Sequence, residues 1–161
     1  MVITLENHHV DMSHNMLGMI DDIVIEDSLK VAFSSDGIPI ASIMTRDVIT
    51  IDHTQTAHDA ATIMMEKKIG SVIVTAYGKP FGIVTERDLA RIMATMDISS
   101  RCLILSYLAS RPLICASPTQ TIQEASNIMG KHNIDHLPIF EKNKIVGMVT
   151  TRDLAMCLLY A

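Results

Sequence analysis

The chain has 161 residues, of which 48% are hydrophobic and 19% are charged, so it has the material for a folded core and is not grossly disordered. Its net charge of −5 argues against a nucleic acid partner, because nonspecific binding to nucleic acid needs a basic surface. No apolar run reaches the roughly 18 residues that a membrane-spanning helix needs, and the early acidic and histidine residues are unlike a signal peptide. We therefore expect a cytoplasmic protein without a membrane partner.

The first 37 residues form an N-terminal arm of unknown role, because nothing later in the chain repeats them. Within the arm, the apolar segment Met16–Ile25 suits a short helix or strand that packs on the core or on a partner. His8, His9 and His14 raise the question of a metal, but no cysteine or recognised ligand spacing accompanies them. We expect a mobile polar arm and no metal site.

The rest of the chain contains the same pattern twice, at a constant offset of 65 residues. The segment GIVTERDLA at Gly82–Ala90 returns as GMVTTRDLA at Gly147–Ala155, and TQT at Thr54–Thr56 returns at Thr119–Thr121. Matches at one fixed offset over this length are hard to produce by chance, and an internal repeat decides the whole fold. We therefore divide the chain into the arm (1–37), a first repeat (38–98) and a second repeat (99–161).

The sequence of the first repeat predicts secondary-structure elements in the order β-α-β-β-α. A short apolar strand at Val48–Ile51 precedes a helix that begins at Thr56 with the spacing of a capping box. Two apolar strands, Val72–Thr75 and Phe81–Val84, then flank a tight turn, and a second helix begins near Glu86. The buried side of this second helix is predicted to hold Leu89, Ile92, Met93 and Met96.

The second repeat predicts the same elements. A helix begins at Thr121, the strands Leu137–Phe140 and Ile145–Val149 follow, and a last helix begins near Thr151. One repeat alone covers only one side of its small sheet, so we expect the two repeats to close a shared core. The fold class is therefore α/β (α+β), with two repeats packed as a pseudo-two-fold module.

The motif Gly-x-Val-Thr-x-Arg-Asp carries the functional signal, and it occurs at the end of a strand and the start of a helix in both repeats. Backbone N–H groups at a helix start favour an anion, and the Thr hydroxyl and Arg guanidinium can hold phosphate oxygens. The Asp can accept hydrogen bonds from two neighbouring sugar hydroxyls. Together these groups suit a ribonucleotide.

The same spacing also fits helix capping. In that interpretation Thr85 and Thr150 are N-caps, and Asp88 and Asp153 satisfy backbone donors. Capping does not require the arginine that precedes each aspartate, which favours a ligand, although both arginines also suit a plain surface. The sequence alone leaves both interpretations open.

These repeats resemble the tandem cystathionine-β-synthase-type (CBS) domains of a Bateman module. The resemblance covers about Ile40–Tyr160 and lies outside the arm. The residues that carry it are IMTRDVITI at Ile43–Ile51, IGSVIV at Ile69–Val74, GIVTERDLA at Gly82–Ala90, IDHLPI at Ile134–Ile139 and GMVTTRDLA at Gly147–Ala155.

The resemblance implies a regulatory module that binds adenosine ligands, such as AMP, ADP or ATP and sometimes S-adenosylmethionine, in two clefts between the repeats. No other cofactor is implied. One cleft is predicted to use Thr45, Ile69, Gly70, Ser71, Thr150, Arg152 and Asp153. The other is predicted to use Thr85, Arg87, Asp88, Ser110, Ile134, Asp135 and His136.

The two clefts are not equal in sequence. Asp135 stands where the first repeat has Gly70, and its charge would repel a phosphate or attract a cationic ligand. His136 suits either contact with a phosphate or a structural role. The ligand of the second cleft therefore stays open.

Three functions remain to be weighed. A sensor of adenosine nucleotides fits best, and an S-adenosylmethionine sensor or a protein-interaction module with empty clefts are the alternatives. An enzyme is not expected, because the sequence has no phosphate-binding Gly-x-x-x-x-Gly-Lys loop and no Cys-His or Ser-His pair placed by a motif. The apolar faces around Leu89–Met96 and Leu154–Leu159 predict a homodimer, the commonest way to cover such patches, and corresponding helices build a flat dimer in the family.

Overall fold

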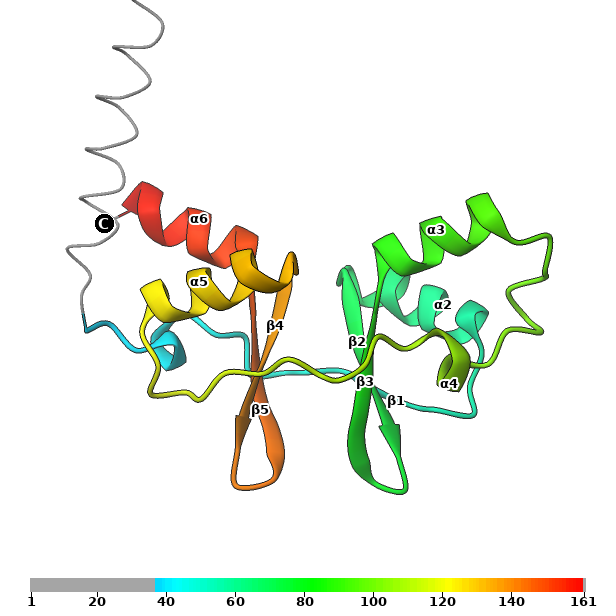
Figure 1. Ribbon diagram of the computed structural model, residues 1–161, viewed down its shortest axis with the longest axis horizontal. Coiled ribbons are helices and arrows are strands. Elements are labelled where there is room, and N and C mark those ends of the chain that lie inside the picture. Colours follow the sequence, from blue (N-terminus) through cyan, green and yellow to red (C-terminus); the bar gives the residue numbers. More distant parts are fainter. Residues whose placement is uncertain (1–36, 161) are drawn as a thin grey trace, which may run out of the picture.

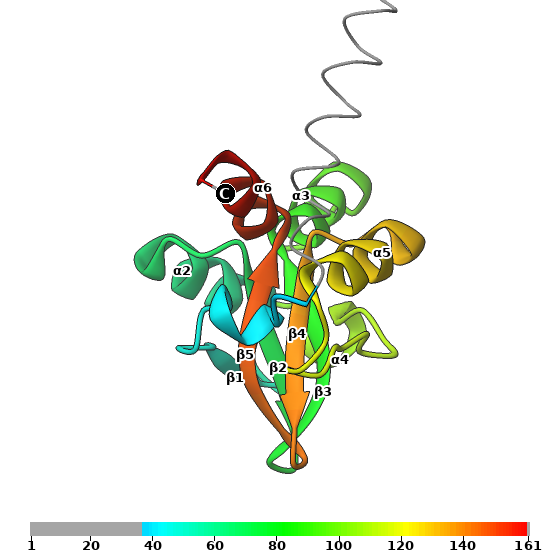
Figure 2. The same ribbon diagram turned by 90° about the vertical axis from the view of Figure 1, so that its left-hand side faces the viewer.

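The computed structural model describes residues 37–160, so the predictions for the N-terminal arm lie outside the described residues. The two repeats stand side by side, and each has a small sheet covered by helices (Figure 1). Helices α3 and α6 lie at one end of the molecule, opposite the two hairpin turns, in both views (Figure 2). In this part of the chain, no helix has both the length and the apolar character needed to cross a membrane.

The observed elements confirm the α/β fold class, and they follow the predicted order except that the second repeat lacks its predicted first strand. The first repeat consists of β1 (Thr50–Asp52), α2 (Ala57–Lys67), β2 (Ser71–Ala76), β3 (Lys79–Thr85) and α3 (Glu86–Thr95). The second repeat consists of α4 (Leu105–Leu108), α5 (Ile122–His132), β4 (His136–Glu141), β5 (Lys144–Thr150) and α6 (Thr151–Tyr160). A 3-10 turn, η1 (Ile40–Ser42), precedes the first repeat.

Equivalent residues begin and end the equivalent helices. Thr56 and Thr121 cap α2 and α5 through complete capping boxes, as predicted. Both helices end at a residue in the left-handed conformation, Lys68 in α2 and Asn133 in α5, and these two positions are also 65 residues apart. The repeated pattern in the sequence therefore sets the helix boundaries.

Both hairpins also turn in the same way. Each has a two-residue turn whose residues have positive φ, Tyr77–Gly78 in the first repeat and Lys142–Asn143 in the second. Positive φ at both positions is the geometry that matches the twist of antiparallel strands. Glycine and asparagine are the residues that adopt it at least cost, and they occupy the second position of the two turns.

The first strand differs between the repeats. In the first repeat β1 pairs with β2, and bonds from Ile73 N to Ile49 O and from His53 N to Thr75 O extend the ladder at 3.1 and 2.8 Å. At the offset of 65, Ile73 and His53 become Pro138 and Pro118, which have no N–H to donate. The second repeat therefore keeps only an isolated bridge between Ala116 and Ile139 in place of a strand.

The apolar core is divided into two clusters, so the prediction of a single core shared by the repeats was wrong. Each repeat has its own apolar cluster, and each cluster is completed by the leading segment of the other repeat, here called its crossing segment. Ile40, which precedes β1 in the first repeat, lies in the core of the second, whereas Leu105, which precedes α5 in the second repeat, lies in the core of the first. Both are fully buried. The repeats are thus interlocked by two crossing segments (Figure 1).

The glycine of the repeated motif has a role in this interlocking. A Cβ atom at Gly82 would lie 2.8 Å from the backbone oxygen of Ser110, and one at Gly147 would lie 2.5 Å from Met44 Sδ. Both neighbours belong to the crossing segments, which approach the strands too closely for a side chain. The requirement for glycine is stricter at position 82, because the neighbouring atom there is a backbone oxygen, which cannot move aside as the flexible Met44 side chain can.

The prediction for the buried side of α3 was partly wrong. Ile92 is buried and Leu89 is half-buried, but Met93 and Met96 are 82% and 48% exposed. Asp88 and Ile92 form the buried stripe, and Met93 lies about 100° further around the helix. Met96 is the C-cap residue and extends past the core.

Candidate functional site

A cavity of about 580 Å³, here called cleft one, lies between the repeats. Its volume is in the usual range for a small-molecule site. All the residues predicted for the first cleft line it, namely Thr45, Ile69, Gly70, Ser71, Thr150, Arg152 and Asp153. The structure thus brings both repeats and a crossing segment to one place.

Local structure explains how cleft one is assembled. Thr45 is held by paired backbone bonds with Met148, N to O in both directions at 2.9 Å, so the crossing segment lies beside β5. Thr150 ends β5 and α6 follows directly, so the first turn of α6, with Thr151 and Arg152, lines the cavity. Gly70 faces them from the loop that enters β2.

Asp153 caps α6, as the capping interpretation predicted. Its Oδ2 accepts hydrogen bonds from Thr150 N and Thr150 Oγ1, both at 2.7 Å. Among the described residues, none donates to Oδ1 of Asp153. One carboxylate oxygen therefore holds the helix start, and the other has no donor among the described residues.

A second cavity of about 480 Å³, here called cleft two, lies on the other side of the pseudo-two-fold. All the residues predicted for the second cleft line it, namely Thr85, Arg87, Asp88, Ser110, Ile134, Asp135 and His136. Ser110 belongs to the other crossing segment and is held by paired backbone bonds with Ile83 at 2.8 and 3.3 Å. The construction repeats that of cleft one.

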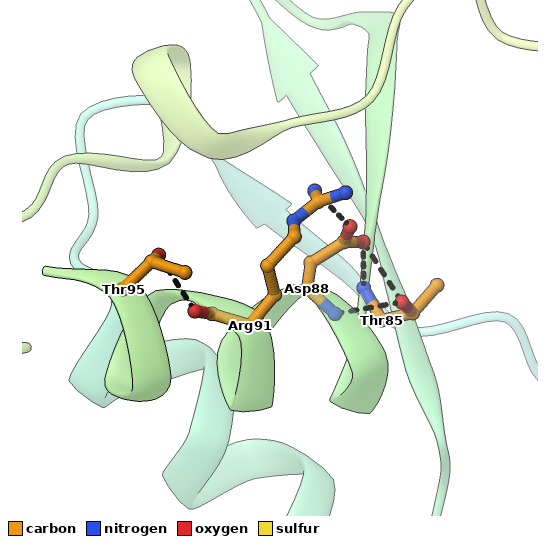
Figure 3. Close-up of polar contacts among 4 residues, drawn as sticks. All are labelled: Thr85, Asp88, Arg91 and Thr95. Carbon is orange, nitrogen blue, oxygen red and sulfur yellow. Dashed lines mark hydrogen bonds and ion pairs between the residues drawn. The ribbon is translucent and has the colours of Figure 1, made fainter.

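The carboxylate of cleft two is fully engaged (Figure 3). Asp88 Oδ2 accepts from Thr85 N and Oγ1 at 3.0 and 2.8 Å, which is the same cap as in cleft one. Asp88 Oδ1 accepts from Arg91 Nη2 at 2.8 Å. At the offset of 65, Arg91 becomes Met156, so Asp153 has no such partner.

A further ion pair joins the repeats at cleft two. Arg87 Nη2 donates to Asp135 Oδ2 across 48 positions of sequence. Arg87 was predicted to meet a phosphate, and the structure pairs it with a carboxylate. A phosphate that enters cleft two must therefore compete with Asp135 for this guanidinium.

Sequence reasoning missed residues that line these cavities. Asp135 and His136 also line cleft one, although they were predicted only for cleft two. Glu86, which looked like an ordinary helix start, lines both cavities, and Lys68 lines cleft one. For Lys68 the available signal was its place directly before the predicted loop at Ile69–Ser71, whereas its left-handed conformation is visible only in the structure.

His136 has a perturbed environment between the clefts. Burial lowers the pKa of its imidazole, and the carboxylates of Asp135 and Glu86 oppose that effect. Arg87 adds to the lowering, whereas Asp153 opposes it. The uncharged imidazole is therefore favoured near neutral pH.

Cleft one combines three kinds of surface. Val48, Ile49, Ile69 and Met148 supply apolar surface, and Lys68 and Arg152 supply positive charge, which the carboxylates of Asp47, Glu86 and Asp135 oppose. Asp153 supplies a free carboxylate oxygen.

Within residues 37–160, no group of three or more His, Cys, Asp or Glu side chains suits a metal ion.

Comparison with known proteins identifies relatives. Residues 40–95 and 105–160 each match the CBS domain family. The chain is 33% identical over 113 residues to the CBS domain-containing protein YhcV of Bacillus subtilis, covering 70% of this chain and 80% of YhcV. The solved structure of a CBS-domain protein from Burkholderia ambifaria, whose name proposes a role in signal transduction, has a TM-score of 0.73 and 27% identity, covering 76% of this chain and 95% of that chain.

Relatives that are named as enzymes match only over a small part of their length. The homoserine O-acetyltransferase of Methanococcoides burtonii is 30% identical over 117 residues, which is 71% of this chain but 23% of the enzyme. The shared region is therefore one part of a larger protein in that relative.

Proposed function

Since this chain belongs to the CBS domain family, whose tandem members are typically regulatory, we propose that it senses adenosine nucleotides in its two clefts and performs no catalysis. The observation that carries the proposal is the composition of cleft one. It places an apolar surface, a helix start with a neighbouring cation and a free carboxylate oxygen around a single cavity.

Each part of a nucleotide has a counterpart in cleft one. The base fits against Val48, Ile49 and Met148, which are partly or fully buried apolar residues. The phosphates fit at the start of α6, where Arg152 can supply a charge-assisted hydrogen bond and its backbone N–H adds to the positive end of the helix. The N–H groups of Thr151 and Asp153 already donate, to Asp135 O at 3.1 Å and to Thr150 Oγ1 at 3.3 Å. Asp153 Oδ1 can accept from the ribose hydroxyls.

The two clefts should differ in affinity. In cleft one Asp153 has an unpaired oxygen and the loop at Gly70 carries no charge. In cleft two Asp88 is engaged by Arg91, and Arg87 is engaged by Asp135. We therefore expect cleft one to bind a phosphorylated adenosine ligand more tightly.

A thermal-shift panel tests the proposal. AMP, ADP, ATP, NAD and S-adenosylmethionine are compared, because a ligand that binds only the folded state raises the melting temperature. An increase with at least one nucleotide is expected. No shift with any of them, and no copurified material absorbing at 260 nm, would favour the alternative of an interaction module with empty clefts.

We also propose a homodimer built on α3 and α6. Met93 and Leu159 are 82% and 75% exposed, and their helices lie at the same end of the molecule. A two-fold dimer would cover these apolar side chains. Light scattering at micromolar concentration should give twice the chain mass of 17.7 kDa, and a monomer mass would count against the dimer.

A further inference from the structure

The two clefts share one wall. Gly70 and Glu86 from the first repeat, and Asp135 and His136 from the second, line both cavities. A Cβ atom at Gly70 would lie 3.0 Å from His136 Nε2 and 3.6 Å from Glu86 Oε2, so both side chains lie close to the glycine. A single layer of side chains therefore separates the cavities.

The charge on this wall depends on one residue of cleft two. Asp135 lines both cavities, but its partner Arg87 lines only cleft two. Both side chains are well exposed, at 69% for Arg87 and 44% for Asp135, so their pairing adds little to stability. Its effect on a ligand is larger, because a carboxylate that loses its cation repels a nearby anion.

Lys68 and Arg152 line cleft one together with Asp135, but among the described residues the ion pair of Asp135 is with Arg87. His136 adjoins Asp135, but its burial favours the uncharged imidazole near neutral pH. Glu86 adds a second carboxylate to the same wall. The neutralisation of Asp135 therefore rests on Arg87.

We propose that the two clefts are negatively coupled for anionic ligands through Asp135. The inference rests on the proposed function, in which nucleotide phosphates enter both clefts. A phosphate that binds Arg87 in cleft two leaves the Asp135 carboxylate unpaired on the wall of cleft one. Cleft one then binds its nucleotide more weakly, and by linkage an occupied cleft one weakens cleft two by the same factor. Two coupled clefts respond over a wider range of nucleotide concentration than two independent copies.

The test asks whether Arg87 controls a cleft that it does not line. ADP is titrated calorimetrically into the full chain, and Arg152→Ala identifies the phase that belongs to cleft one. Arg87→Ala should weaken that phase by about three- to tenfold, and raising the salt concentration should reduce the loss. Adding Asp135→Asn to Arg87→Ala should restore the cleft-one affinity. Lys79→Ala, which removes an equal charge from an exposed site at the start of β3, is the matched control and should change nothing.

The outcomes separate the coupling from the function. If Arg87→Ala leaves the cleft-one phase unchanged, or if Asp135→Asn does not reverse its loss, the coupling is wrong and nucleotide binding stands. If the unaltered protein shows no ADP phase and no thermal shift with any nucleotide, the proposed function fails and the coupling fails with it. Thermal melting of each variant shows that the protein is folded, which is expected because Arg87 is exposed.

Discussion

Cleft one and cleft two have the same construction, but their charged groups are engaged differently. In both, a threonine and an aspartate cap the helix that follows the last strand. In cleft two the remaining oxygen of Asp88 accepts from Arg91, whereas at the equivalent position cleft one has Met156 and a free oxygen on Asp153. Two repeats can therefore share a fold while the charged groups of one cleft are engaged by internal ion pairs.

The aspartate of the repeated motif can take part in helix capping and in ligand binding at the same time. Helix capping and ligand binding were alternatives in the sequence, but a carboxylate has two oxygens and can serve both purposes. Asp153 uses Oδ2 for the cap and leaves Oδ1 open, so capping does not exclude a ligand there. In Asp88 both oxygens are taken.

The largest expected effect comes from removing the two carboxylates in turn. Asp153→Ala should remove the tighter calorimetric phase for ADP, a loss of at least about tenfold, because a charge-assisted hydrogen bond is lost. Asp88→Ala should affect only the weaker phase, and the double variant should lose both. Each change also removes a helix cap worth about 1 kcal/mol.

The capping loss has its own control. Asp59→Ala removes the equivalent cap of α2, and Asp59 lines neither cleft one nor cleft two. It should lower the melting temperature in the same way and leave ADP binding intact. Retention of the tighter phase in Asp153→Ala, with its loss in Asp88→Ala, would reverse the ranking of the clefts.

An exchange of one residue between the clefts should produce a smaller effect. Arg91→Met frees Asp88 Oδ1 and should strengthen cleft two by roughly three- to tenfold, or about 0.7–1.4 kcal/mol. Met156→Arg should engage Asp153 and weaken cleft one by a similar factor. Calorimetry with ADP measures both. Unchanged affinities in the two variants would show that Arg91 does not compete with the ligand.

A change of ligand charge should shift the balance by a few-fold. S-adenosylmethionine has no phosphate and carries a positive sulfur centre, so it gains nothing from Arg87, which a phosphate in cleft two must win from Asp135. The preference for cleft one should therefore be smaller with S-adenosylmethionine than with ADP, roughly two- to fivefold smaller. Asp135→Asn should remove the difference between the ligands, and its persistence in that variant would assign the discrimination to another residue.

The smallest expected effect concerns pH. Burial lowers the pKa of His136 from its ordinary value of 6.5, so below that pH the unfolded chain binds more protons than the folded one. The contribution of the uncharged His136 to the free energy of unfolding is complete above pH 6.5. This contribution is lost as the pH falls through the lowered pKa of His136 in the folded protein. Urea denaturation should therefore show that the free energy of unfolding falls more steeply with decreasing pH in the unaltered protein than in His136→Gln. Parallel curves would mean that His136 titrates normally.

The local structure was largely predictable from sequence. The capping boxes at Thr56 and Thr121, the two hairpins and the helix starts after Thr85 and Thr150 all follow from short patterns of neighbouring residues. The missing strand of the second repeat also has a signal in the sequence. Pro118 stands at the position equivalent to His53, whose N–H donates to the neighbouring strand, and proline has no N–H to donate.

The membership of each cleft was predicted because the family resemblance supplied it, and the repeat offset pointed to equivalent positions. The charge pairs within the clefts were not predicted. Arg91 reaches Asp88 within one helix, but nothing in the spacing shows that a guanidinium will turn toward the cap rather than toward solvent. Arg87 and Asp135 are 48 positions apart, and only the packing of the repeats brings them together.

The sequence by itself therefore determined the repeated elements, their caps and their turns, because these depend on residues within a few positions of one another. Tertiary structure alone decided that the segments at Ile40 and Leu105 cross into the opposite cores, which is why Gly82 must lack a side chain. It also decided that His136 and Asp135 stand between two cavities rather than beside one. Contacts of this kind depend on how one repeat is seated against the other, which no local pattern of residues specifies.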